Sequence, residues 1–123
     1  MKFMQENSGN SLTIQGYEKG QVIINGASYH SSLIVTPSKV ITQWRPVEFS
    51  DLTENDFIPL IDLQPEMILL GTGASHKFPH PSLTRAIMQQ RIGLDAMNTA
   101  AACRTYNILM AEGRRVAAAL FMI

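Results

Sequence analysis

The stretch that decides the fold is residues 67–120, which read MILLGTGASHKFPHPSLTRAIMQQRIGLDAMNTAAACRTYNILMAEGRRVAAAL. The continuous apolar run at 67–70 is typical of a strand that is covered on both faces. An amphipathic helix is predicted from about Ser82 to Arg91, and a second strand at 94–97. An alanine-rich helix follows, from a cap at Asn98 or Thr99 to about Glu112. With the strand predicted at the end of the chain, this alternation forms a β-α-β-α-β unit over about 66–123 and predicts an α/β fold.

The last segment, residues 116–123, is ambiguous because alanine favours helix. We predict a buried strand there. Gly113 is placed to end the preceding helix in a left-handed conformation, and the run after it is apolar on both faces.

The first 45 residues read as an antiparallel β unit over about 12–45. Strands are predicted at 12–14 and 21–24, and Asn25-Gly26 supplies the positive φ angles of a type I′ turn into a return strand at 27–33. Two further short strands, 33–35 and 40–42, flank a turn. Residues 1–11 are expected to form a loose arm. After Trp44-Arg45-Pro46 closes the unit, Asp51 or Thr53 is expected to cap a short helix.

Length and charge limit the classes of function. A chain of 123 residues fits one domain, 1–123, and its formal net charge of zero gives no reason to expect nucleic acid or an anionic membrane as a partner. Cys103 is the only cysteine, which fits a reducing compartment and a buried structural role. The first eight residues lack the apolar core of a secretion signal, and the longest apolar run is far shorter than the roughly 20 residues that span a bilayer. We therefore expect a cytoplasmic protein without membrane insertion.

Polar and glycine residues follow two of the predicted strands. If these strands are parallel neighbours, their carboxyl ends form one crevice, and free N–H groups at the start of the alanine-rich helix favour an anionic or carbonyl ligand. The alternative is purely structural: the glycines make a tight turn, and the polar residues cap the helix. The candidate ligand-binding residues are Gly71, Thr72, Gly73, Asn98, Thr99 and Arg104.

No complete catalytic or cofactor motif accompanies this crevice. Gly71-Thr72-Gly73 lacks the third glycine of a dinucleotide fingerprint, and prolines beside His80 remove the helical geometry that could make His76 and His80 a metal pair. Ser75 and His76 have no third residue to form a hydrolase triad. We predict no cofactor, no metal and no catalytic residue. These predictions favour a protein that is not an enzyme.

Several other side chains have two interpretations. Trp44, Phe49 and Phe57 either pack in the core or form an exposed aromatic patch for a partner. Tyr106 and Asn107 are expected to be structural, with Asn107 bonding a neighbouring segment.

Several of these motifs together resemble one family. The strings LLGTG (69–73), MNTAAACRTYNIL (97–109) and EGRRVAAAL (112–120), with ING at 24–26 and WRP at 44–46, are similar to the small α/β protein family that includes mitochondrial respiratory complex I assembly factor 3 and bacterial and archaeal relatives. The resemblance implies a three-layer fold, with a mixed central sheet, flanking helices and an N-terminal antiparallel β layer. Where the family often has Glu and Asp around the Met97 position, this chain has Asp95 and Asn98.

The resemblance implies a role through protein contacts. Our first hypothesis is a non-catalytic cytoplasmic interaction or assembly-accessory protein with an unidentified protein partner. The alternative is a small-molecule binding protein, or an enzyme, that takes an anion or carboxylate in the crevice. A homodimer through exposed edge strands of the N-terminal β unit is also left open.

Overall fold

The computed structural model describes residues 11–123. The arm predicted for residues 1–11 therefore lies outside the described residues, apart from Ser11. The described part holds eight strands, three α-helices and two short 3-10 helices. In chain order they are β1 (Ile14–Glu18), β2 (Gln21–Ile24), β3 (Ala27–Tyr29), β4 (Leu33–Val35), β5 (Val40–Ile41), η1 (Phe49–Asp51), η2 (Glu54–Phe57), α2 (Ile58–Asp62), β6 (Met67–Gly71), α3 (Pro81–Gln89), β7 (Gly93–Met97), α4 (Thr99–Ala111) and β8 (Val116–Leu120).

The large sheet has five strands in the order β5-β4-β8-β6-β7. β6 runs parallel to both of its neighbours, β7 and β8, whereas β4 pairs antiparallel with β8 and with β5. The final apolar segment is thus a strand, as predicted, and all five of its residues are buried near the middle of the sheet. The predicted mixed α/β fold is confirmed.

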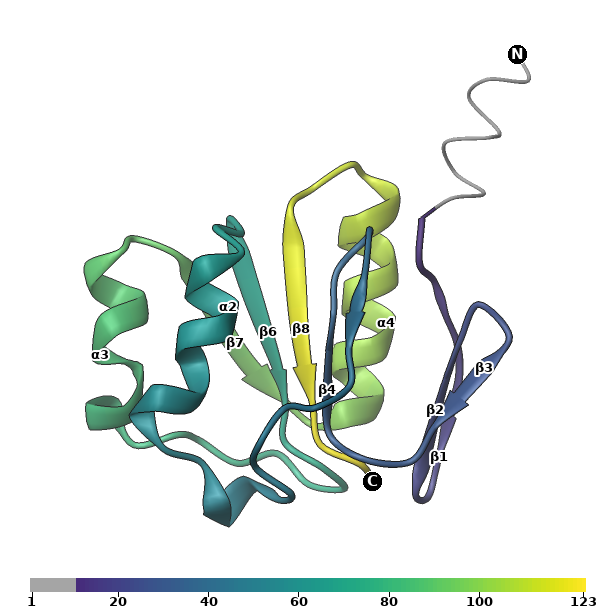
Figure 1. Ribbon diagram of the computed structural model, residues 1–123, viewed down its shortest axis with the longest axis horizontal. Coiled ribbons are helices and arrows are strands. Elements are labelled where there is room, and N and C mark those ends of the chain that lie inside the picture. The colour runs from purple at the N-terminus through teal and green to yellow at the C-terminus, as the bar shows by residue number, and fades with distance from the viewer. Residues whose placement is uncertain (1–10) are drawn as a thin grey trace.

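Three layers are visible in Figure 1. α4 and the three-stranded sheet β1-β2-β3 lie on one face of the large sheet, while α2 and α3 cover the other. Each face has its own apolar cluster. One cluster joins Val22 and Leu33 to Tyr106 of α4, and the other joins Trp44 and Phe57 to Ile87 of α3.

The N-terminal β segment divides differently from the prediction. The return strand expected at 27–33 ends at Tyr29, and Leu33 begins β4. β4 and β5, expected to belong to one antiparallel unit over 12–45, pair instead into the large sheet through the β4–β8 ladder. The N-terminal antiparallel layer therefore consists of β1, β2 and β3 alone.

Trp44 and Phe57 pack in the core, which decides between the two interpretations of these residues. The Trp44 ring lies 5.1 Å from that of Phe121, and its indole N–H donates to the Asp56 carbonyl oxygen at 2.9 Å. Of the two caps predicted from the sequence, Asp51 and Thr53, it is Thr53 that caps η2. The Thr53 N–H donates to the Asp56 carboxylate at 2.8 Å.

Candidate functional site

The ends of β6 and β7 lie side by side, as the sequence predicted. The parallel register pairs Gly71 with Met97, and the Thr72 N–H donates to the Met97 carbonyl oxygen at 2.8 Å. Backbone bonds continue past the strands, because the Thr99 N–H donates to the Gly73 carbonyl oxygen at 2.9 Å. The two polar segments therefore form one rim at the carboxyl ends of both strands.

Thr99 lies at the centre of this rim and is fully buried. Its hydroxyl donates to the Phe121 carbonyl oxygen at 2.6 Å and accepts the Gly73 N–H at 2.8 Å. One side chain thus ties together the ends of β6 and β8 and the start of α4. The hydroxyl of Thr72 also bonds within the protein, since it donates to the Ser75 carbonyl oxygen at 2.6 Å.

The other candidate residues have equally defined contacts. A Cβ built on Gly71 would lie 2.9 Å from Leu120 Cδ2 and 3.0 Å from Thr99 Oγ1, so the glycine permits the close approach of α4. Asn98 caps α4, and its Oδ1 accepts the Ala101 N–H at 2.8 Å. Arg104 is turned to the small sheet, where it donates to the Tyr17 hydroxyl at 2.8 Å.

The structure thus brings five of the six predicted residues together at the rim and directs Arg104 to β1. The hydroxyls of Thr72 and Thr99 and the amide of Asn98 serve the fold itself. Ligand binding at this rim stays a prediction.

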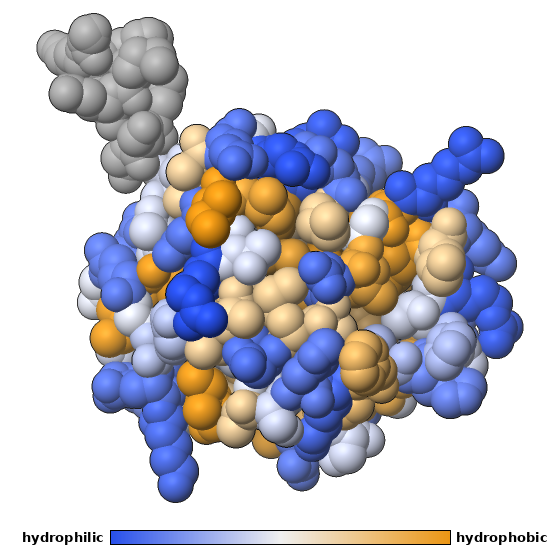
Figure 2. Space-filling view, turned by 180° about the vertical axis from the view of Figure 1, so that it is seen from behind, coloured by the Kyte–Doolittle hydropathy of each residue, from blue (hydrophilic) through white to orange (hydrophobic). Residues whose placement is uncertain are grey.

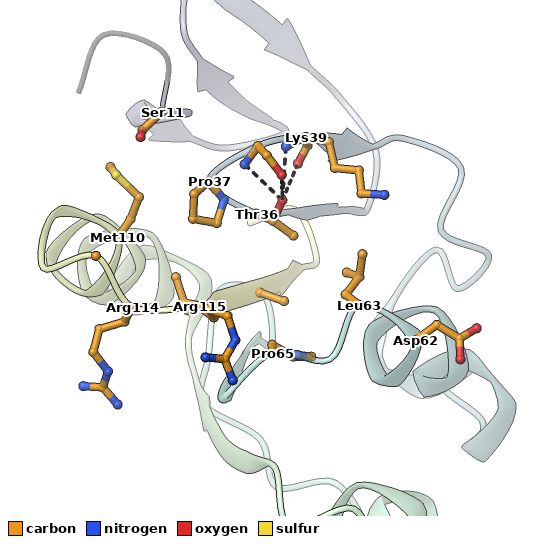
Figure 3. A pocket seen from close by; sticks show the side chains of 14 residues that line it. Ser11, Thr36, Pro37, Lys39, Asp62, Leu63, Pro65, Met110, Arg114 and Arg115 are labelled. Carbon is orange, nitrogen blue, oxygen red and sulfur yellow. Dashed lines mark hydrogen bonds between the residues drawn. The ribbon is translucent and has the colours of Figure 1, made fainter. Parts of the chain in front are cut away.

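A hollow of about 610 Å³ lies near the opposite end of the strands. It is bounded by the turn between β4 and β5, the end of α2 and the segment that joins α4 to β8 (Figure 3). Lys39 and Asp62 lie on separate elements at its border (Figure 3), and its lining includes Leu63, Pro65 and Val116. The charged groups do not converge on one point, so the hollow lacks the geometry of an anion site.

The titratable groups of the core are held in their neutral or paired forms. Burial raises the pKa of the Cys103 thiol to about 12, so the thiol stays protonated and unreactive at neutral pH. Burial also raises the pKa of Tyr106. The hydrogen bond from Arg45 lowers the pKa of the buried Asp56 carboxyl, which accepts two guanidinium N–H groups at 2.8 and 2.7 Å.

Within residues 11–123, no group of three or more His, Cys, Asp or Glu side chains is arranged to hold a metal ion. The His80 Nδ1 atom accepts the Ser82 N–H at 3.1 Å and caps α3, and the His76 ring packs against Phe78. These two histidines therefore have separate local contacts.

The edge of the large sheet at β7 was missed in the sequence. In the described part of the chain β7 pairs with β6 alone, and its central residue, Asp95, is exposed. A charge in the middle of an otherwise apolar strand is a common feature of edge strands, and it is the signal that could have located this edge.

Comparison with known proteins settles the family. The family described as "Protein of unknown function (DUF498/DUF598)" matches residues 14–121. The chain belongs to this family. The resemblance noted from the sequence motifs is confirmed, because its relatives include proteins named NADH dehydrogenase [ubiquinone] 1 alpha subcomplex assembly factor 3.

The bovine protein of that name is 30% identical over 122 residues, which cover 98% of this chain and 66% of the bovine protein. The chain thus spans slightly less than two thirds of the length of this relative. A Francisella tularensis relative, named 13 kDa major membrane protein, is 28% identical over 117 residues. The match covers 94% of this chain and 95% of the Francisella protein.

Solved structures of similar proteins have the same fold. A crystal structure of a Bordetella parapertussis protein is 33% identical, with a TM-score of 0.87, and the match covers 92% of this chain and 97% of that one. None of the helices within residues 11–123 is long and apolar enough to cross a membrane.

Proposed function

We propose that this protein is a non-catalytic, cytoplasmic assembly-accessory protein, which acts by binding another protein. The observation that carries the proposal is the match of 98% of the chain to a relative named as an assembly factor. The bonding of the rim gives further support, since its buried polar groups hold strands and helix together.

Respiratory NADH dehydrogenase is the first candidate for the complex that is assembled, because the name of that relative specifies it. The test is to delete the gene in its own organism and to measure assembled NADH dehydrogenase on native gels. We expect a reduced amount of the complex, restored by the wild-type gene. An unchanged amount would contradict this choice of complex.

The assembly-accessory role itself is tested by affinity purification of the tagged chain from its own organism. We expect a protein partner in stoichiometric amount. Recovery of the chain alone would favour the small-molecule hypothesis if a carboxylate or phosphate also raises its melting temperature and Asn98→Asp abolishes that shift. Asp caps a helix as well as Asn does, so this variant adds a negative charge at the rim without removing the cap of α4.

The cytoplasmic location is tested by cell fractionation. The single cysteine is consistent with a reducing compartment. We expect the chain in the supernatant after centrifugation of the membranes. A chain that stays with the membranes after high-salt and carbonate washes would contradict this part of the proposal.

A further inference from the structure

Among the strands of residues 11–123, β7 has a neighbour on one side only. The Gly93 N–H donates to the Glu66 carbonyl oxygen at 3.1 Å, and the Met97 carbonyl oxygen accepts the Thr72 N–H at 2.8 Å. Backbone groups of a parallel strand point alternately to its two sides, so those of Leu94 and Ala96 point away from β6. Because β7 pairs with β6 alone among the described strands, these N–H and C=O groups are open to an added strand.

The side chains around this edge are largely apolar. Leu94 and Ala96 are half-buried against the cluster on the α3 side, while Met97 packs against the cluster on the α4 side. In Figure 1, β4 lies at the front of the large sheet and β7 lies behind β6. Figure 2 shows the molecule from behind, so it faces the side of the sheet where β7 lies. Apolar side chains gather in the centre of that face, with hydrophilic side chains among them and around them (Figure 2). An added strand would therefore find both backbone partners and apolar contacts.

Asp95 places one charge in the middle of this edge. Its carboxylate is exposed and has no hydrogen bond or ion pair with any residue from 11 to 123. In an antiparallel pair of two copies that uses all five residues of β7, Asp95 would face Asp95 of the other copy. The two Cα atoms of such a pair are about 4.5 Å apart, and like charges directly opposite each other destabilise the pair. A lysine or arginine opposite Asp95 would be attracted instead.

We propose that the β7 edge binds an extended segment of a partner protein as a sixth strand of the large sheet, with a Lys or Arg opposite Asp95. The residues before and after this cation are apolar, because their side chains fall on the α3 side beside Leu94 and Ala96. The proposal rests on the proposed function, and it specifies the surface and the chemistry of the partner. Main-chain hydrogen bonds supply affinity, and the charge selects the segment.

The test uses the chain as its own probe. In the variant Asp95→Lys, β7 becomes a strand with a central cation flanked by Leu94 and Ala96. In a β7–β7 pair, two wild-type copies place Asp95 opposite Asp95, and two copies of the variant place Lys opposite Lys. In an equimolar mixture, a wild-type copy and a variant copy place Asp opposite Lys. We expect both proteins alone to be monomers in sedimentation velocity, and the mixture to form a heterodimer with an association about tenfold tighter or more.

The matched control is Glu112→Lys, which makes the same change of charge at the exposed residue that ends α4. Mixed with wild type, this control should stay monomeric. Addition of NaCl to about 0.5 M, where the Debye length is about 4 Å, should weaken the Asp95→Lys heterodimer. Asp95→Arg is the second variant if Asp95→Lys does not fold, as judged by circular dichroism.

Amide hydrogen exchange locates the contact. We expect the amides of Leu94 and Ala96 to exchange more slowly in the mixture. The amide of Gly93, which already donates to the Glu66 carbonyl oxygen, should change little. A mixture that associates no more than its components would overturn the proposal. Slower amide exchange confined to β3 in the mixture would also overturn it, because the contact would then lie at the small sheet. A wild-type dimer with slower exchange at Leu94 and Ala96 would overturn it too, because two Asp95 carboxylates would then not prevent pairing. Since only the purified chain is used, these failures leave the assembly proposal to its own test.

Discussion

Gly71 shows how closely α4 approaches the sheet. A Cβ at this position would meet the Thr99 Cα atom at 3.1 Å, as well as Leu120 Cδ2 at 2.9 Å. We predict that Gly71→Ala destabilises the protein by about 1–3 kcal/mol, because backbone must shift to admit the methyl group. Urea unfolding measures the change.

The matched control is Gly16→Ala, where the nearest atom to the new Cβ would be Ile23 Cδ1 at an ordinary 3.5 Å. Its stability should change by much less. Equal losses in the two variants would show that the tight contact between α4 and β6 is not the cause.

The Thr99 hydroxyl is the second strong constraint at the rim. Thr99→Val would leave the Phe121 carbonyl and the Gly73 N–H without their partner in a fully buried position. We expect a loss of about 2–3 kcal/mol in urea unfolding, and a smaller loss for Thr99→Ser, which keeps the hydroxyl. A serine variant as unstable as the valine variant would contradict the role of the hydroxyl, because serine keeps the hydroxyl and valine does not.

Asp56 makes stability depend on acid. The hydrogen bond from Arg45 holds its pKa below the ordinary value of 3.8, so the folded state binds fewer protons than the unfolded state. This contribution is complete above about pH 5 and is lost as the pH falls through the unfolded and then the folded pKa.

Asp56→Asn should therefore lose less stability than wild type over that acid range, although it is less stable at neutral pH. The measurement is urea unfolding at a series of pH values. Asp95→Asn removes an exposed carboxylate that has no hydrogen bond or ion pair within residues 11–123. This variant serves as the control and should keep the acid dependence of wild type. Parallel curves for Asp56→Asn and wild type would disprove the role of this pair.

At the scale of elements, α4 holds the small sheet in place. The Asn107 amide accepts the Ile14 N–H at 2.9 Å and donates to the Ile14 carbonyl oxygen at 2.8 Å, and the Tyr106 hydroxyl donates to the Leu12 carbonyl oxygen at 2.7 Å. The structural role predicted for both residues is thus observed. Asn107 replaces a strand at this edge of β1.

We predict that Asn107→Ala raises amide exchange in β1 and β2 more than in β6 and β8, because β1 loses both of these bonds. Glu112→Ala, at the exposed end of the same helix, should leave the pattern unchanged. Exchange that rises uniformly over the whole protein would mean that the small sheet does not open separately.

The elements from β6 to β8 could be predicted from the sequence because their limits are set locally. Asn98 caps α4, and Pro81 lies in the first turn of α3, where proline is favoured. Gly113, after α4, has the expected positive φ of 79°. The Asn25-Gly26 turn, with φ angles of 44° and 87°, was equally local.

The pairing of β4 with β8 could not be predicted in this way. It joins Leu33 to Leu120, and both strands are apolar throughout, so alternation gives no register. The same non-local pairing determines which strand is left at the edge. For the candidate site, the sequence predicted the meeting of the two strand ends, but the choice of Thr99 partners depends on β8, which lies between β4 and β6.

At the scale of the whole molecule, we propose that a partner protein binds at the β7 edge of the large sheet. A formal net charge of zero leaves short-range charge and apolar contact, rather than long-range attraction, to select that partner. In our proposal, Asp95 is the residue that selects the partner by its charge.

The most direct test is quantitative affinity purification from the native organism with wild type, Asp95→Lys and Glu112→Lys at equal expression. We expect one stoichiometric partner with wild type and with Glu112→Lys, and the loss of this partner with Asp95→Lys. Equal recovery with all three proteins would contradict the role of the β7 edge, and recovery of wild type alone, without any partner, would contradict the assembly function itself.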